Sequence, residues 1–71
     1  MPLVNVELIE GVFSSEQKKD MIKKITDTMV SIEGENLRGV TWVKINEIKE
    51  GDWGIGGQTL TAGDVKAMAK G

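Results

Sequence analysis

The sequence predicts an α+β fold, in which a β-α-β unit is followed by a glycine-rich C-terminal hairpin or loop. Three observations predict it. A segment of alternating apolar residues opens the chain, a stretch with helical periodicity follows, and a second alternating segment leads into a run that holds four of the nine glycines. At 71 residues the chain is expected to form a single domain, residues 1–71, near the lower size limit for independent folding.

The first strand is predicted over residues 2–9. Val4, Val6 and Leu8 fall on one face, and the alternating positions from Leu3 to Ile9 fall on the other. This alternation, with β-branched residues, is typical of a strand. The pair Glu10-Gly11 ends it.

A helix is predicted from a cap at Ser14 to about residue 33. Ser14 and Gln17 have the spacing of a capping box, in which each side chain satisfies the backbone N–H of the other residue. Asp20 and Lys24 lie one turn apart and should pair. Gly34 ends the helix. Its core face is predicted from residues that recur at spacings of three and four, namely Met21, Ile22, Ile25, Met29 and Ile32.

The second strand is predicted over residues 40–48, with Trp42 and Lys44 on one face and Val43 and Ile45 on the other. Residues 49–57 should form a loop or tight hairpin. Thr61 can cap a short last helix that runs through residue 68. The two strands have room to pair in parallel through a right-handed crossover.

The predicted unit is incomplete as a monomer. One helix covers one face of a two-stranded sheet and leaves the other face bare, and two strands are too few for a stable independent sheet. Other copies of the chain are the expected cover, in a closed symmetric assembly. The sequence therefore predicts a homo-oligomer.

Composition excludes several classes of function. The chain has no cysteine and no histidine, which excludes disulfides, thiolate or histidine metal sites and a histidine-based triad. Its net charge of −2 argues against a nucleic-acid partner. No apolar run has membrane-spanning length, and the first residues do not resemble a signal peptide. We expect no metal, no membrane partner and a cytoplasmic location.

Pro2 is the candidate catalytic residue. If Met1 is removed, as is usual ahead of a small residue, Pro2 becomes an N-terminal secondary amine. An N-terminal amine titrates near pH ~8, and lower when it is desolvated, so it can accept a proton near neutrality. Internal prolines have no basic nitrogen. This position predicts a general base.

Taken together, these features resemble the 4-oxalocrotonate tautomerase family. The residues that carry the resemblance are Pro2 at the start of the first strand, Leu8-Ile9-Glu10-Gly11, Ser15-Glu16-Gln17-Lys18, Glu47 and Trp53-Gly54-Ile55-Gly56-Gly57. The resemblance covers about residues 2–60. It implies a β-α-β subunit that pairs into dimers, usually three of them in a hexamer. It also implies a proline that moves a proton between the oxygen and carbon ends of a dienol, with no cofactor.

The resemblance also implies substrate-binding residues. An aromatic residue ahead of the glycine run lines the pocket beside the proline, and Trp53 holds that place. Its bulk would lower the pKa of the proline by excluding water. Trp53 could equally be a hydrophobic anchor in a subunit interface.

The family's two carboxylate-binding arginines are missing. The first location reads Val12-Phe13, and the second falls on Trp42. The candidates for a replacement cation are Arg38 and Lys44. Lysine lacks the bidentate fork of arginine, and both residues could simply be solvated. A substrate with one carboxylate and an apolar or aromatic remainder therefore fits better than a dicarboxylate.

The resulting hypothesis is a tautomerase acting on a 2-hydroxy-dienoate or an aryl enolpyruvate. One alternative is a non-catalytic oligomeric scaffold or binding module of the same fold. Another is a dehalogenase or hydratase acting on an unsaturated acid, which would need a carboxylate to activate water. The glycine run lacks the spacing of a dinucleotide-binding loop.

Overall fold

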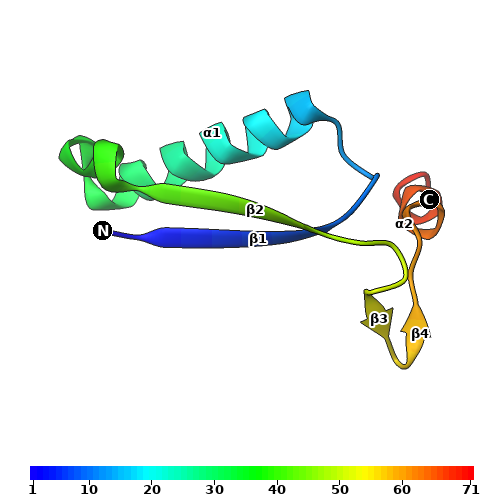
Figure 1. Cartoon of the computed structure of the whole chain (residues 1–71). Helices are drawn as coiled ribbons and strands as arrows, with labels where there is room; N and C mark the ends of the chain where they lie inside the picture. The colour runs from blue at the N-terminus through cyan, green and yellow to red at the C-terminus, as the bar shows by residue number, and fades with distance from the viewer.

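The computed structural model describes residues 1–71. Figure 1 shows helix α1 along one face of the β1–β2 sheet, while β3, β4 and α2 project beyond the end of the sheet opposite the N-terminus. The molecule is elongated, with extents of 43 × 23 × 19 Å. The predicted β-α-β unit with a C-terminal hairpin is confirmed. In chain order the elements are β1 (Leu3–Ile9), α1 (Ser15–Glu33), a 3₁₀ helix η1 (Glu35–Val40), β2 (Trp42–Ile48), β3 (Gly54–Ile55), β4 (Gln58–Thr59) and α2 (Ala62–Ala69).

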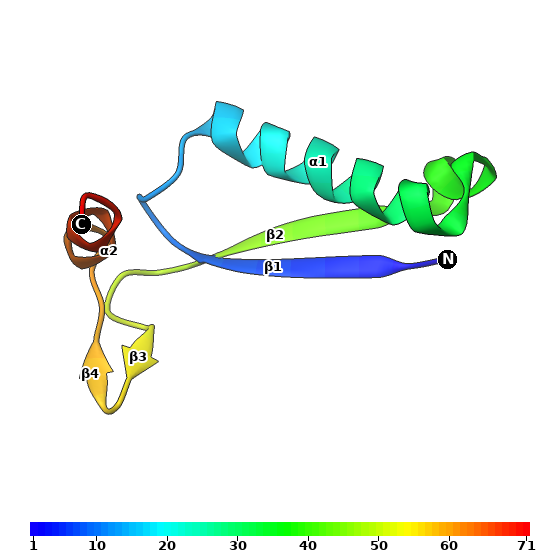
Figure 2. The same ribbon diagram turned by 180° about the vertical axis from the view of Figure 1, so that it is seen from behind.

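Strands β1 and β2 pair in parallel, from Leu3 opposite Trp42 to Ile9 opposite Ile48. The view from behind in Figure 2 shows that α1 is the only cover of this sheet. The second strand begins two residues later than the sequence predicts. The reason is that residues 35–40 wind into η1, and the N–H of Thr41 still bonds the carbonyl of Arg38 at 3.2 Å.

The ends of α1 follow the local sequence signals. The Ser14 hydroxyl accepts the N–H of Gln17 at 3.1 Å, and the Gln17 side chain accepts the N–H of Ser14 at 2.9 Å. Asp20 and Lys24 pair at 2.9 Å. The helix ends at Gly34, whose φ of 106° favours glycine. These predictions are confirmed.

The predicted core face of α1 is only partly right. Met21, Ile25 and Met29 are half-buried, but Ile32 is 79% exposed and the most buried residue of the helix is Val30. Ile32 follows Thr28 by four residues, so it lies on the row that borders the open groove beside β1. The two strands do not reach far enough to cover that row.

The C-terminal segment forms a two-residue hairpin and a short helix. Gly56 and Gly57 occupy the turn with φ values of 58° and 85°, and positive φ at both positions is the requirement of the turn that best matches strand twist. Helix α2 begins with a capping box between Thr61 and Asp64 and ends one residue beyond the predicted limit. Neither α1 nor α2 combines the length and apolar character needed to cross a bilayer.

The chain has almost no interior of its own. Only Ile9 and Val30 are buried, at 5% and 7% exposure. Large apolar side chains such as Leu3, Trp42 and Ile55 are more than half exposed. Association with other chains is one way in which small domains with so little interior are stabilised.

Candidate active site

Pro2 stands at the first rung of the sheet. Its carbonyl oxygen accepts the backbone N–H of Trp42 at 3.0 Å, and its side chain is half-buried. Proline is tolerated at this point because it precedes the strand, where the ladder does not require a backbone N–H donor. The bond uses the carbonyl of Pro2, so it does not depend on the presence of Met1.

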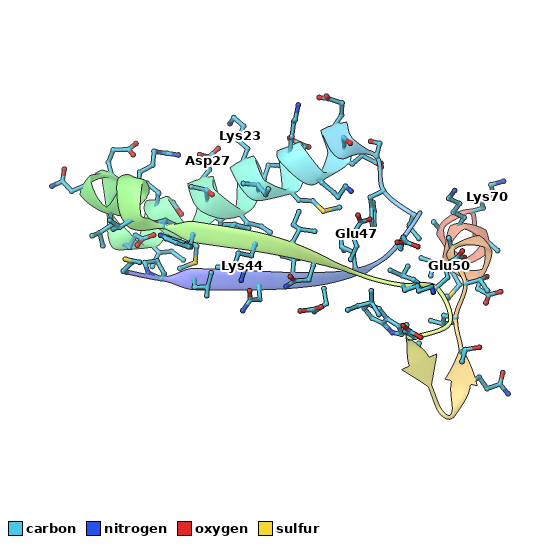
Figure 3. All side chains as sticks on the ribbon, viewed as in Figure 1. Lys23, Asp27, Lys44, Glu47, Glu50 and Lys70 are labelled. Carbon is cyan, nitrogen blue, oxygen red and sulfur yellow. The ribbon has the colours of Figure 1, made fainter.

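Trp42 and Lys44 lie on the face of the sheet that α1 does not cover, level with Leu3 and Asn5 of β1. Figure 3 labels Lys44 on β2 and Glu47 farther along the same strand. Glu47 turns to the helix side and pairs with Lys18 at 2.9 Å. Lys44 takes part in none of the six ion pairs of the chain. Its ammonium group is therefore available to an anion.

Arg38 is at the same end of the molecule, but its charge is already engaged. Its guanidinium pairs with Asp27 at 2.9 Å and donates a second bond to Glu35. The bond from Arg38 holds the pKa of the Glu35 carboxyl below its usual value. The pKa of Asp27 is lowered first by Lys23 and then by Arg38. The pKa of Arg38 itself is raised, chiefly by Glu35.

Trp53 lies at the opposite end of the sheet from Pro2. The seven residues of β1, at ~3.3 Å per residue, separate the two ends by roughly 20 Å. Figure 1 shows the N-terminus and the β3–β4 hairpin at opposite ends of the molecule. Within one chain, therefore, Trp53 does not reach Pro2, and the expected contact between them requires Trp53 from another copy.

The hairpin end contains an apolar cavity of about 220 Å³. Sequence reasoning missed most of its walls. Phe13, Leu60 and Val65 line the cavity but come from three separate segments. The only feature of the local sequence that could have indicated this wall is the apolar residue Val65 within a helix capped by Thr61. Its lining consists of Glu7, Leu8, Ile9, Phe13, Trp53, Ile55, Leu60 and Val65.

Comparison with known proteins decides the family. A family model described as "Tautomerase enzyme" matches residues 2–63, which is most of the chain. The chain belongs to the tautomerase family. This tautomerase is 38% identical over 61 residues to "Probable tautomerase K2" of Dickeya dadantii, covering 86% of the chain and 90% of the relative.

Solved structures agree with the family match. A crystal structure described as apo unfused 4-OT superposes with a TM-score of 0.73 at 37% identity, covering 83% of the chain and 93% of the other protein. A 4-oxalocrotonate tautomerase isozyme of Methylibium petroleiphilum superposes with a TM-score of 0.72 at 33% identity, covering 90% and 97%. The predicted family and fold are confirmed, and the chain is a tautomerase, that is, an isomerase.

The tautomerase match ends inside α2. The family model stops at residue 63, whereas the helix spans Ala62–Ala69 and contributes Val65 to the cavity. No three acidic side chains come together in a way that could hold a metal ion. The candidate residues from the sequence remain Pro2, Lys44, Arg38, Trp42 and Trp53, and the structure adds the apolar walls at the hairpin end.

Proposed function

We propose that this tautomerase interconverts the enol and keto forms of a 2-hydroxy acid, of the aryl enolpyruvate or 2-hydroxy-dienoate type, with Pro2 as base and acid. The nitrogen of Pro2, freed by removal of Met1, takes the proton of the enol hydroxyl. The electron pair moves through the double bond, and the same proton is returned to carbon. The step is a net isomerisation and needs no cofactor.

The observation that supports this proposal best is the anchoring of Pro2. The bond from the Trp42 N–H to the Pro2 carbonyl, at 3.0 Å, fixes the residue at the first rung of a regular ladder. A base must be held within hydrogen-bond reach of the proton it moves, so a fixed position is a requirement for the role.

A second copy of the chain is proposed to complete the site. The free edge of β1 borders both hollows of the molecule, because each is lined by residues of β1 and by none of β2. An unpaired edge is a template for another strand. A two-fold pairing of β1 with its copy, centred on Val6, would place Pro2 opposite Glu10 of the partner strand. Trp53 and the apolar cavity of that copy would then adjoin Pro2.

Lys44 is the proposed partner of the substrate carboxylate. It is unpaired and lies on the face shared with Trp42, whereas Arg38 would have to give up Glu35 and Asp27 first. Leu3 and Trp42, which are both about half exposed, are the proposed contact through which dimers associate into a hexamer, a trimer of dimers. A dimer alone is the alternative assembly.

The proposal is tested by following ketonisation of phenylenolpyruvate and 2-hydroxymuconate with protein whose mass confirms loss of Met1. We expect Pro2→Ala to lower kcat/KM by about a hundredfold or more. A form with a Gly-Ser extension before Pro2 should be equally inactive, because the proline nitrogen is then an amide. If wild type and Pro2→Ala both match the buffer rate, the tautomerase proposal for these substrates is wrong, and a non-catalytic scaffold becomes the better description.

A further inference from the structure

Helix α2 lies mostly beyond the residues that the family model matches. We propose that α2 builds a subsite for the aryl or similarly bulky apolar end of a substrate with a single carboxylate, and that Val65 and Phe13 determine this specificity. The inference rests on the proposed function, since the subsite would serve the Pro2 of a neighbouring copy. It assigns a role to the segment that the family match leaves unexplained.

Helix α2 is held in place by contacts of its first turn. The N–H of Ala62 bonds the carboxylate of Glu50, and Figure 3 shows Glu50 beside this helix. The Ala62 methyl packs so closely on Gly11 that a Cβ at Gly11 would lie 3.3 Å from it. The Thr61 hydroxyl accepts the N–H of Asp64 at 3.1 Å. Helix α2 is thereby tied both to the loop after β2 and to the turn after β1.

With α2 held in this way, Val65 lines the same cavity as Phe13 and Trp53. The β3–β4 hairpin is closed at its base, because the N–H of Leu60 bonds the carbonyl of Trp53 at 2.8 Å. The cavity is therefore assembled from the β1–α1 turn, the hairpin and α2 together.

The size of the cavity fits an aromatic ring. An engineered apolar cavity of about 150 Å³ binds benzene. The cavity here, at about 220 Å³, has room for a phenyl group and the methylene that carries it. It is open on one side, as it must be if the rest of the substrate extends to Pro2 of another copy.

The charge of the lining excludes a second carboxylate. Seven of the eight lining residues are hydrophobic, and the one charged residue is Glu7. Transfer of a carboxylate into such an apolar site is unfavourable. A substrate that enters this cavity must therefore direct an uncharged end into it and keep its carboxylate outside.

The test compares Val65→Asp with the matched control Ala67→Asp, which adds the same charge to an exposed position of the same helix. Exchange of the C3 protons for deuterium is followed by NMR on phenylpyruvate and on 2-oxobutanoate. We expect Val65→Asp to lower kcat/KM for phenylpyruvate by about tenfold or more, with less than about a twofold change for 2-oxobutanoate. Ala67→Asp should change neither.

Val65→Thr provides a second variant of almost unchanged volume, for the case in which Val65→Asp does not fold. It should lower kcat/KM for proton exchange of phenylpyruvate by about threefold and leave that of 2-oxobutanoate nearly unchanged. If the folded and assembled Val65 variants lower kcat/KM equally for both substrates, or for neither, the proposed subsite is wrong. The proposed mechanism of Pro2 is not affected by that result.

Failure of the proposed function is recognised separately, by the absence of Pro2-dependent exchange with both substrates. In that case 3-phenylpropanoate is titrated into the wild-type protein while methyl resonances are recorded. Shifts confined to Val65, Ile55 and Leu60 would support the cavity as an aryl site without catalysis. Unmoved methyl resonances would overturn it.

Discussion

The two ends of the sheet are built in different ways. The proline end is held by regular backbone structure, with the β1–β2 ladder beginning at the bond between Pro2 and Trp42. The hairpin end has only two short strands of two residues each, and its shape depends on side chains from segments far apart in the chain. The position of Pro2 and the shape of the apolar pocket therefore depend on different contacts.

Among variants that keep Pro2, the largest effect is expected at the hairpin end. Trp53→Ala removes an indole that lines the cavity and should lower kcat/KM for phenylenolpyruvate by about tenfold, because the indole no longer excludes water from the substrate. Amide hydrogen exchange in the β1–β2 ladder at the proline end should not change. A loss of the same size in Trp53→Phe, which keeps an aromatic wall, would contradict this explanation.

The next prediction compares the two cations near Pro2. Lys44→Gln should raise KM about threefold to tenfold with little change in kcat, because an exposed cation contributes modestly to binding a carboxylate. Arg38→Gln should change KM less, since its guanidinium is engaged by Asp27 and Glu35. Steady-state kinetics at fixed ionic strength measures both. A larger increase of KM in Arg38→Gln than in Lys44→Gln would indicate that Arg38 binds the substrate carboxylate.

Gly56→Ala should weaken the hairpin without affecting the rest of the sheet. A φ of 58° costs an alanine about 1 kcal/mol, so hydrogen exchange at the Leu60 amide should become about fivefold faster. Gly39→Ala is the control, because an added Cβ there meets nothing within 4 Å and no left-handed φ is required. Equal acceleration in both variants would show that the turn is not the cause.

The smallest effect concerns acid stability at the proline end. Ion pairing holds the pKa values of Asp27 and Glu35 below their ordinary values of 3.8 and 4.5. Their stabilising contribution is therefore present above those ordinary values and is lost as the pH falls through the lowered folded-state pKa values. The stability difference between wild type and Arg38→Gln, measured by urea unfolding, should shrink from pH 7 to pH 3. A difference that is independent of pH would contradict this.

The sequence predicts well those features that depend on neighbouring residues. The capping boxes at Ser14 and Thr61 and the glycine turn at Gly56 depend on contacts within a few residues, and all were predictable. The exposure of Ile32 was not predictable, because it depends on where the sheet ends beneath the helix.

Features of the candidate site that join distant segments were also beyond local reasoning. The pair of Arg38 with Asp27 spans η1 and α1, and the cavity joins Phe13 to Val65. The distance between Pro2 and Trp53 follows from the parallel pairing of the strands, whereas the resemblance placed both residues at one site. The proposed second copy of the chain would bring the two residues to one site.

The central claim is that Pro2 of one copy works with the hairpin end of another. It is tested most directly by mixing Pro2→Ala and Trp53→Ala proteins, unfolding and refolding them together, and measuring phenylenolpyruvate ketonisation. Half of randomly assorted dimers are mixed, and each mixed dimer has one intact site, so activity should recover to about a quarter of the wild-type value. Activity that stays at the average of the two separately refolded variants would contradict the shared site.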